Sequence, residues 1–454
     1  MKKANQSMLQ GPLLGSIITY TVPIILTSIL QLLFNAADLV IVGRYRGSLS
    51  VAAVSATSSL IALIINLFVG LSVGAGVCVA HAIGGREDKA VHQTVHTAIP
   101  LALVGGGIVT LVGIFFSEYF LRLMGTPENV LPLSALYMKI YFGGMIFTMI
   151  YNFCSSILRA LGDTKSPLIF LTISGIVNVI FNIFFVTVFH MNVEGVALAT
   201  VISQAISAVL VVIALMRRTD ASKLYLRKLR FYKAPLLKML RIGLPAGLQG
   251  SLFSISNVTI QSAVNSFGDV VMSGNGAAAS IEGFVYVTLS AFQQTALNFI
   301  GQNAGAHQYD RIKKIFYQCL ASSAIVTLLF GGSVYLFGEQ LLSIYITDSQ
   351  QAIQYGIARF GYVALLYFIC ALMEVTTGAL RGLGASLTPM LISIMGICGL
   401  RIVWVQTIFQ IPAYHTPESL YISYPISWIL TFIPQLLCYI YIYKKRVKAD
   451  QLAH

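Results

Sequence analysis

The chain has 454 residues, of which 57% are hydrophobic and 10% are charged, and its mean hydropathy is +0.80. Soluble domains carry roughly 25% charged residues, so this composition excludes a soluble globular protein and indicates many membrane spans. The formal net charge of +13 would suit a nucleic-acid-binding protein, but we assign it to membrane topology below. The six cysteines are scattered through apolar segments without C-x-x-C spacing, and we expect them to be packing residues.

Twelve apolar runs follow one another along the chain, and each has about 20 residues or more, enough to cross a ~30 Å hydrocarbon core. They cover residues 17–42, 51–80, 93–117, 131–157, 167–190, 194–216, 236–266, 277–300, 315–337, 352–378, 388–410 and 420–443. We therefore predict an all-α polytopic membrane protein with twelve transmembrane helices. The runs at 51–80 and 236–266 exceed a straight crossing, so we expect them to tilt, kink or protrude.

The sequence also repeats itself. The stretch LRALGD that begins at Leu158 returns 222 residues later as LRGLGA from Leu380, and the same offset relates Pro23 to Pro245. Each copy holds six predicted helices, an even number, so both copies enter the membrane in the same orientation. We predict two six-helix lobes related by a parallel, pseudo-two-fold internal repeat, with a cavity between them, as is typical of transporters.

The longest polar stretch, residues 217–241, has nine Lys or Arg residues and one acid, Asp220. We predict an N-terminal lobe at 1–216, a cytoplasmic basic linker at 217–241 and a C-terminal lobe at 242–454. The linker serves as a topology anchor, and we expect it to lie against anionic lipid headgroups.

Positive charge is distributed very unevenly between the two sides of the predicted membrane. Of the 29 Lys and Arg residues, Arg44, Arg46 and Arg122 fall outside, and Lys139, Arg359 and Arg401 fall inside helices. The other 23, including Lys2 and Lys3, fall on the side that holds both termini. The positive-inside rule predicts that both termini are cytoplasmic, in a plasma membrane or cell inner membrane. The charge excess then requires no nucleic-acid partner, and we expect no cleavable signal peptide.

Motifs for catalysis and cofactor binding are missing from the sequence. It contains no G-x-x-x-x-G-K-[ST] loop, no H-E-x-x-H and no dinucleotide-binding fingerprint, so we expect neither an enzyme nor a cofactor. His92 and His96 have metal-ligand spacing on a helix, but no thiolate or further carboxylate pattern supports a metal site.

Asp38 is the most informative ionisable residue inside a predicted helix, because a charge in hydrocarbon is costly and usually functional. At 1.5 Å per residue, Asp38 and Thr200 lie about 9 Å below the outer surface and Asn182 about 12 Å below it. Asn178 lies one turn from Asn182 on the same face. We predict that these four residues form one ion-coupling site, which could hold a proton on a desolvated carboxylate or coordinate Na⁺ through oxygens. The alternative is that Asp38 is a hydrogen-bonded structural acid.

The second copy does not repeat this polar group. The 222-residue offset places Ile260, Leu400 and Trp404 at the positions equivalent to Asp38, Asn178 and Asn182. We therefore expect the ion step to belong to the first lobe.

Five further residues are candidates for the substrate cavity. Glu282, Glu374 and Arg401 could line the cavity, where acids would attract cationic substrates, or pair with each other and serve packing. Tyr137 and Tyr141, four residues apart on one predicted helix, could face the cavity or belong to the core.

With these residues identified, the chain resembles the multidrug and toxic compound extrusion (MATE) family over nearly its whole length. The resemblance rests on the FNAAD segment that ends in Asp38, the doubled L-R-x-L-G turn before proline, and the GQNAGA segment from Gly301. It implies antiport, in which cationic or amphipathic compounds leave the cell while H⁺ or Na⁺ enters. It also implies small-molecule drugs and membrane lipids as partners, and we expect a monomer.

The family's first-lobe acid falls on Asp38, and its polar partners fall on the three other residues of the predicted site. A member with a well-described proton site has an aspartate where this chain has Asn182. The acids of the norfloxacin-exporting, sodium-coupled branch correspond here to Phe253 and Cys370. The chain is therefore more similar to the DNA-damage-inducible branch, which favours H⁺ over Na⁺.

The leading hypothesis is thus a multidrug efflux antiporter that works by rocker-switch alternating access. The alternative is a flippase for lipid-linked saccharides, which would need several cationic residues to hold a pyrophosphate. Lys139, Arg359 and Arg401 are the intrahelical cations available for that role. A membrane enzyme or receptor is a third class, which the missing catalytic motifs and the missing soluble domain argue against.

Overall fold

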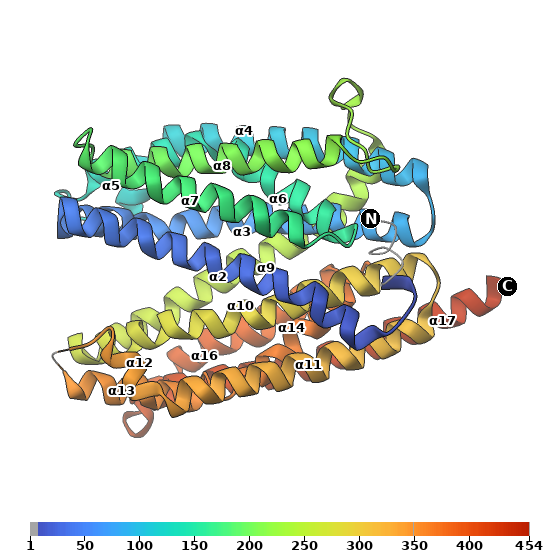
Figure 1. The fold of residues 1–454 in the computed structure, drawn as a ribbon. Coiled ribbons are helices and arrows are strands. Elements are labelled where there is room, and N and C mark those ends of the chain that lie inside the picture. Colours follow the sequence, from blue (N-terminus) through green and yellow to red (C-terminus); the bar gives the residue numbers. More distant parts are fainter. Residues whose placement is uncertain (1–7, 348, 454) are drawn as a thin grey trace. The chain divides into compact units, whose positions relative to one another are not determined.

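The computed structural model describes residues 8–347 and 349–453, and Lys2 and Lys3 lie outside these ranges. The described chain is a set of long α-helices joined by short connections (Figure 1). No β-strand occurs in the part of the chain that the structure describes, which confirms the all-α prediction.

The first half of the chain holds α2 (Leu13–Arg46), α3 (Ser48–Gly84), α4 (Asp88–Leu123), α5 (Leu131–Gly143), α6 (Met145–Ala160), α7 (Lys165–Thr187) and α8 (Val193–Met216). The short η1 (Leu226–Lys228) and the long α9 (Lys233–Asn265) follow. The second half holds α10 (Asp269–Gly305), α11 (Tyr309–Leu336), α12 (Gly338–Ser343), α13 (Gln350–Tyr362), α14 (Tyr367–Gly382), α15 (Leu387–Ser393), the π-helix η2 (Ile394–Gly399), α16 (Leu400–Gln406), η3 (Ile408–Gln410), η4 (Pro412–Tyr414) and α17 (Pro417–Ala453).

Within the described residues, eight helices are long and apolar enough to cross a membrane, and two bent helix pairs raise that number to ten. The pairs are α5 with α6 and α13 with α14, each bent by 48°. These ten coincide with ten of the twelve predicted spans. The remaining two predictions fall on α9 and α10, whose 33 and 37 residues are long enough to cross but more polar. Twelve crossings therefore remain a prediction.

The described chain divides into two compact units. Unit 1 comprises Met1–Thr21 and Leu248–His454, and unit 2 comprises Val22–Gly247. The divisions fall within α2 and α9, each about two residues from a repeated proline, Pro23 and Pro245. Helix α9 begins at Lys233, within the stretch 217–241 that we predict as the linker. Pro235 falls in the first turn of α9, where a missing N–H is tolerated.

In unit 2, helices α7 and α8 lie side by side, and α4 packs against α5 and α6 (Figure 1). Two small-residue motifs, GLSVG from Gly70 on α3 and GLPAG from Gly243 on α9, bring these two helices into backbone contact. A Cβ on Gly74 would lie 2.9 Å from the Gly243 nitrogen and 3.0 Å from its Cα. A Cβ on Gly247 would lie 2.8 Å from the carbonyl carbon of Leu67. Paired small-xxx-small motifs of this kind let helices approach closely in membranes.

The basic linker docks onto the first turns of α4 through His96. The Nδ1 of His96 donates to the His92 carbonyl (2.8 Å), and its Nε2 accepts the Tyr225 backbone N–H (3.1 Å). Both ring nitrogens are therefore committed to protein partners. No group of three or more potential metal ligands occurs among the described residues.

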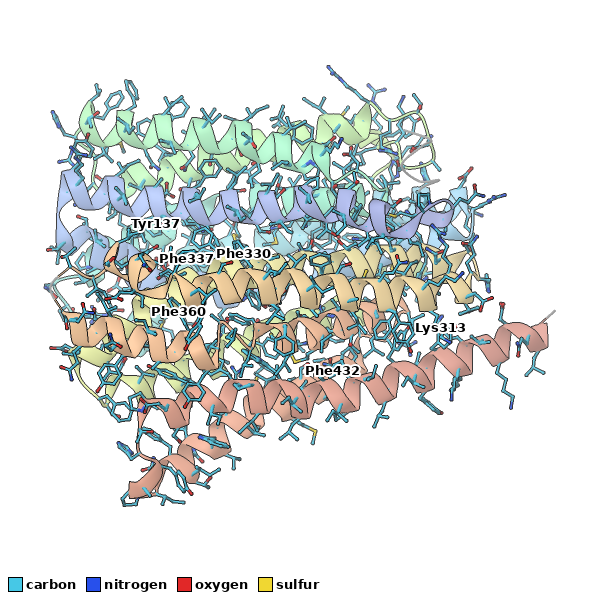
Figure 2. The ribbon with its side chains drawn as sticks, turned by 60° about the horizontal axis from the view of Figure 1, so that its bottom comes forward. Tyr137, Lys313, Phe330, Phe337, Phe360 and Phe432 are labelled. Carbon is cyan, nitrogen blue, oxygen red and sulfur yellow. The ribbon has the colours of Figure 1, made fainter. Side chains whose placement is uncertain are left out.

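Unit 1 is built around α10, which packs against α11, α13 and α14, while α14 packs against α17. Its apolar core includes Phe360 and Tyr421, both fully buried, and Trp428. Phe360 on α13 and Phe432 on α17 are labelled in Figure 2, where the long α17 extends past the end of α11 that carries Lys313.

We predict that Gly74→Ala destabilises the protein by about 1–3 kcal/mol, because the added methyl group overlaps the α9 backbone, which cannot shift like a side chain. Gly107→Ala, in the middle of α4 with no heavy atom within 4 Å of its Cβ, is the matched control. It should be neutral or stabilising by up to ~1 kcal/mol through helix propensity. Thermal unfolding of the two purified variants measures the difference. Equal melting temperatures would contradict the close α3–α9 contact.

Candidate functional site

The four residues of the predicted ion-coupling site come together inside unit 2. Asp38 lies on α2, Asn178 and Asn182 on α7, and Thr200 on α8. Asp38 is 9% exposed and Asn182 is fully buried. The close packing of α7 against α8 positions three of the four side chains. The i, i+4 spacing of Asn178 and Asn182 places their amides on one helix face.

The hydrogen bonds of the site form a closed set around the Asp38 carboxylate. Asn182 Nδ2 donates to Asp38 Oδ1 and to Asn178 Oδ1, the latter at 3.2 Å. Asn178 Nδ2 donates to Thr200 Oγ1 (3.3 Å). The Thr200 hydroxyl lies 3.4 Å from Asp38 Oδ2 and 3.0 Å from the Val196 carbonyl oxygen. Each carboxylate oxygen therefore has one polar side chain beside it.

This arrangement can satisfy Asp38 in two charge states. When Asp38 is ionised, Asn182 and Thr200 donate to its two oxygens. When Asp38 carries a proton on Oδ2, that O–H can donate to Thr200 Oγ1 while the Thr200 hydroxyl donates to Val196. The Asn182 amide bond to Oδ1 persists in both states. The site can thus take up or release a proton by turning one hydroxyl group.

A bare cation fits the same geometry less well. The amide nitrogen of Asn182 stands between Asp38 Oδ1 and Asn178 Oδ1, two of the oxygens that Na⁺ would need. The buried Asn182 Oδ1 has no hydrogen-bond partner among the described residues. It would have to rotate toward the carboxylate before it could serve as a cation ligand.

Tyr137 and Tyr141 lie near this site on α5. Their rings stack with centroids 6.0 Å apart, and α5 packs against α8, the helix that carries Thr200. Tyr137, labelled in Figure 2, is 6% exposed. The pair therefore borders the ion-coupling site, whatever its role toward a substrate.

In unit 1, Glu282 on α10 pairs with Arg359 on α13. Arg359 Nη2 lies 2.7 Å and Nε 3.1 Å from Glu282 Oε2, and both side chains are buried. Arg359 Nη1 donates to Asn275 Oδ1 (2.7 Å), and its guanidinium faces the ring of Tyr424 at 5.3 Å. Glu282 is thus part of a neutralised, hydrogen-bonded ion pair.

The other two second-lobe candidates have separate partners. Glu374 on α14 is buried and accepts a hydrogen bond from Gln293 on α10. Arg401 on α16 donates to Ser427 Oγ (3.2 Å) and to Asn257 Oδ1 (3.4 Å). The structure corrects the idea that Glu282, Glu374 and Arg401 pair with each other. Mutual pairing fails because Glu282 has Arg359 within reach.

Sequence reasoning did not connect Arg359 to Glu282, although it identified both as intramembrane charges. They are 77 residues apart on helices whose pairing has no local signature. The opposite charges of Glu282 and Arg359, and their similar positions along their helices, were the features of the sequence that could have suggested the pair. The sequence analysis also did not identify Asn275 or Tyr424, the other two side chains that contact the Arg359 guanidinium.

A protein-family model described as MatE matches residues 23–184 and 245–405, more than half of the chain. “Probable multidrug resistance protein YoeA” of Bacillus subtilis (strain 168) is 27% identical, over 94% of this chain and 93% of its own length. “Multidrug export protein MepA” of Staphylococcus aureus (strain bovine RF122 / ET3-1) is 22% identical, over 97% of this chain and 96% of its own.

Among solved structures, one described as the outward-facing conformation of a multidrug resistance MATE family transporter of the MOP superfamily has a TM-score of 0.90. It is 20% identical, over 97% of this chain and 98% of its own. At this level of sequence identity, the similarity shows that the two proteins share a fold. Together with the apolar helices and the family model, it establishes the class of the molecule. The chain is a multi-pass membrane protein that belongs to the MatE family.

Proposed function

We propose that this protein exports cationic or amphipathic organic compounds from the cell in exchange for protons. The single observation that carries the proton assignment is the Asp38 site, whose hydrogen bonds accommodate both an ionised and a protonated carboxylate. Family membership and the names of relatives such as YoeA and MepA support multidrug export. No cofactor enters this proposal, since the coupling ion itself supplies the driving force.

Proton coupling would work through the packing of three helices. Protonation of Asp38 from outside removes a buried negative charge and reverses its hydrogen bond with Thr200. Because Asn178 also donates to Thr200, the change reaches both α7 and α8. We propose that this repacking favours substrate release to the outside, and that the empty carrier then returns the proton to the inside.

We further propose two six-helix lobes that alternate access by a rocker-switch, with both termini cytoplasmic. The two segments matched by the family model begin 222 residues apart, the same offset as the repeated turn, which supports an internal duplication. The lobes at 1–216 and 242–454, the linker at 217–241 and a monomeric state are parts of the same proposal.

The position of the acid also bears on the branch of the family. Asp38 lies in the first half of the chain, whereas Phe253 and Cys370 stand where the norfloxacin-exporting branch has second-half acids. We therefore place the chain nearer to the DNA-damage-inducible branch. For a member of that branch, we expect H⁺ to be the coupling ion.

A flippase for lipid-linked saccharides is the second candidate, and the buried charges disfavour it. Of the intrahelical cations, Arg359 is neutralised by Glu282, and Lys139 is exposed. Among the described helix residues this leaves two buried guanidinium groups in unit 1, Arg381 and Arg401, and both donate to neutral side chains. That is little positive charge for holding a pyrophosphate group.

We predict that Asp38→Asn abolishes proton-driven ethidium efflux, because an amide cannot bind and release a proton. Transport would be measured in proteoliposomes with a proton gradient alone and then with a sodium gradient alone. The wild type should respond to the proton gradient. Asp269→Asn, at an exposed acid in the first turn of α10, is the matched control and should transport normally.

A fully active Asp38→Asn protein would rule out this site as the coupling site. Transport that responds to the sodium gradient alone, and that Asp38→Asn abolishes, would show that Asp38 is the coupling site but that the coupling ion is Na⁺.

We predict that Asn182→Leu lowers the transport rate about 10–100-fold, because it removes a buried hydrogen bond to a charged group while approximately preserving volume. Asn182→Asp should retain proton-driven transport. Its second carboxylate next to Asp38 raises the cost of double ionisation, so one proton is shared between the two acids. Initial rates over a pH series measure both effects. An Asn182→Leu rate equal to wild type would contradict a role for this amide.

A further inference from the structure

Arg46 differs from the other two basic residues that we predict on the outer side of the membrane. Arg122 is paired with two nearby glutamates, and Arg44 is exposed. Arg46 is half-buried in the last turn of α2, and its guanidinium binds backbone oxygens of another segment. Its Nη2 donates to the carbonyl oxygen of Val186 (2.6 Å), and its Nε donates to that of Met191 (2.8 Å). We call these two hydrogen bonds the Arg46 clasp.

Both acceptors of the clasp lie at the outer end of α7. Val186 is in the last turn of this helix, which ends at Thr187, and Met191 is in the connection to α8. The last carbonyl groups of a helix have no partner within the helix and carry partial negative charge, so they bind a guanidinium well. Since neither the arginine nor a backbone carbonyl titrates near neutral pH, the clasp itself does not depend on pH.

The corner between α2 and α3 is attached to the same connection at a second point. Gly47 forms this corner with a φ of 83°, a left-handed conformation that favours glycine, and its N–H donates to the Gly43 carbonyl oxygen (3.2 Å). Ser50 on α3 then donates through Oγ to Asn192 Oδ1 (2.7 Å). The outer end of α2 is therefore fixed to the α7–α8 connection from both sides of the corner.

The clasp lies on the same seam as the ion-coupling site. Three contacts join α2 to α7 along this seam: Phe34 covers Gly175, Asp38 accepts from Asn182, and Arg46 donates to Val186. Val186 is one turn, about 6 Å, beyond Asn182, and Arg46 is eight residues, about 12 Å, beyond Asp38. The spacings of four and eight residues on α2 place its three side chains near one helix face. The clasp thus closes the seam directly above the carboxylate.

We propose that Arg46 is a positioning residue for Asp38, and that the clasp keeps the carboxylate within reach of Asn182 and Thr200 by holding α2 against α7. This inference rests on the proposed proton coupling and adds a residue to it. Both neighbours donate to the ionised carboxylate and thereby stabilise it. An open clasp lets α2 move away from these donors, which favours the protonated form. A closed clasp therefore favours proton release, and an open clasp favours proton uptake.

Few of the groups around Asp38 change charge near neutral pH. The amides and the hydroxyl group of α7 and α8 do not titrate, the arginines stay charged, and the tyrosines of α5, Tyr137 and Tyr141, normally ionise at about pH 10. At the α7–α8 connection, Glu194 accepts the Asn192 backbone N–H (2.9 Å), and His190 is exposed. Of these groups, Asp38 and His190 are the ones whose charge normally changes between about pH 5 and 9. His190→Gln is therefore one of the controls.

The test measures the proton occupancy of Asp38 in the purified full-length protein, without any ion gradient. Dicyclohexylcarbodiimide modifies protonated carboxyl groups in apolar surroundings, and mass spectrometry of the peptides locates the modified residue. In Arg46→Gln, labelling of Asp38 should persist to a pH about 0.5–1 unit higher than in wild type, because the ionised carboxylate has lost donors. Glu374 is the internal reference in unit 1, and its labelling should have the same midpoint in both proteins. An equal Asp38 midpoint in a folded Arg46→Gln protein would overturn the proposal.

Two further arginine variants separate the clasp from the charge of Arg46. Arg44→Gln removes an exposed arginine from the same end of α2, and it should label like wild type, as should His190→Gln. Arg46→Lys keeps the charge without the planar fork, so its Asp38 midpoint should lie between those of wild type and Arg46→Gln. A wild-type midpoint in Arg46→Lys would show that charge alone acts, and would overturn the proposal. Arg46→Lys decides the question in this way even if Arg46→Gln does not fold.

The pH profile of transport gives a second measurement. In proteoliposomes, the midpoint of ethidium efflux against pH should move upward in Arg46→Gln by about 0.5–1 pH unit, a 3–10-fold change in proton affinity. Arg44→Gln should keep the wild-type profile. A purely structural role for Arg46 would lower the rate equally at every pH and leave the midpoint in place, which would contradict the proposal.

The two proposals fail separately. A shifted Asp38 labelling midpoint in Arg46→Gln, in a protein without proton-driven efflux, would reject the export function and keep the role of Arg46. Proton-driven efflux by the wild type, with equal labelling midpoints in wild type and Arg46→Gln, would do the reverse.

Discussion

The cost of placing charged and polar groups away from water governs this structure more than any single contact. An aspartate or arginine at the centre of a membrane helix costs about 2.5–3.5 kcal/mol on insertion scales. The buried ionisable residues Asp38, Glu282, Glu374 and Arg359 each have a hydrogen-bond partner on another helix. These partners determine which helix faces meet, because an amphipathic stripe is a weak guide when the surrounding lipid is itself apolar.

The two halves of the chain meet this cost in different ways. In unit 2, the acid Asp38 is surrounded by neutral amides and a hydroxyl group, which can follow a change in its charge. In unit 1, Glu282 is fixed by a guanidinium that cannot lose its proton, so its charge is locked. A buried acid can act as a proton carrier when its partners are neutral. Asp38 meets this condition, and so does Glu374 of unit 1, which accepts from the neutral amide of Gln293, whereas Glu282 does not.

Much of the fold could be predicted from the sequence because hydrophobic runs report directly on helices. All twelve predicted spans fall on helices or on bent helix pairs. The breaks within α5–α6 and α13–α14 were not predicted, because no proline or run of charged residues lies at either break. The α3–α9 contact at Gly70 and Gly243 was also missed, although its paired G-x-x-x-G spacing is present in the sequence.

For the candidate site, depth counting along helices placed Asp38, Asn182 and Thr200 together, and the structure brings them into hydrogen-bonding contact. The depth of a residue along its helix does not show which side chain donates each hydrogen bond in the site. Counting likewise could not pair Glu282 with Arg359, since rotation about the helix axis decides which side chains face each other.

The offset of 222 residues gives these differences a common origin. If the chain arose by duplication, the two copies began with equivalent polar positions and then diverged. The position of Asn178 became Leu400, and Arg401 stands directly beside it. The guanidinium of Arg401 in the second copy thus lies one residue from the counterpart of Asn178, a residue of the predicted ion-coupling site in the first copy.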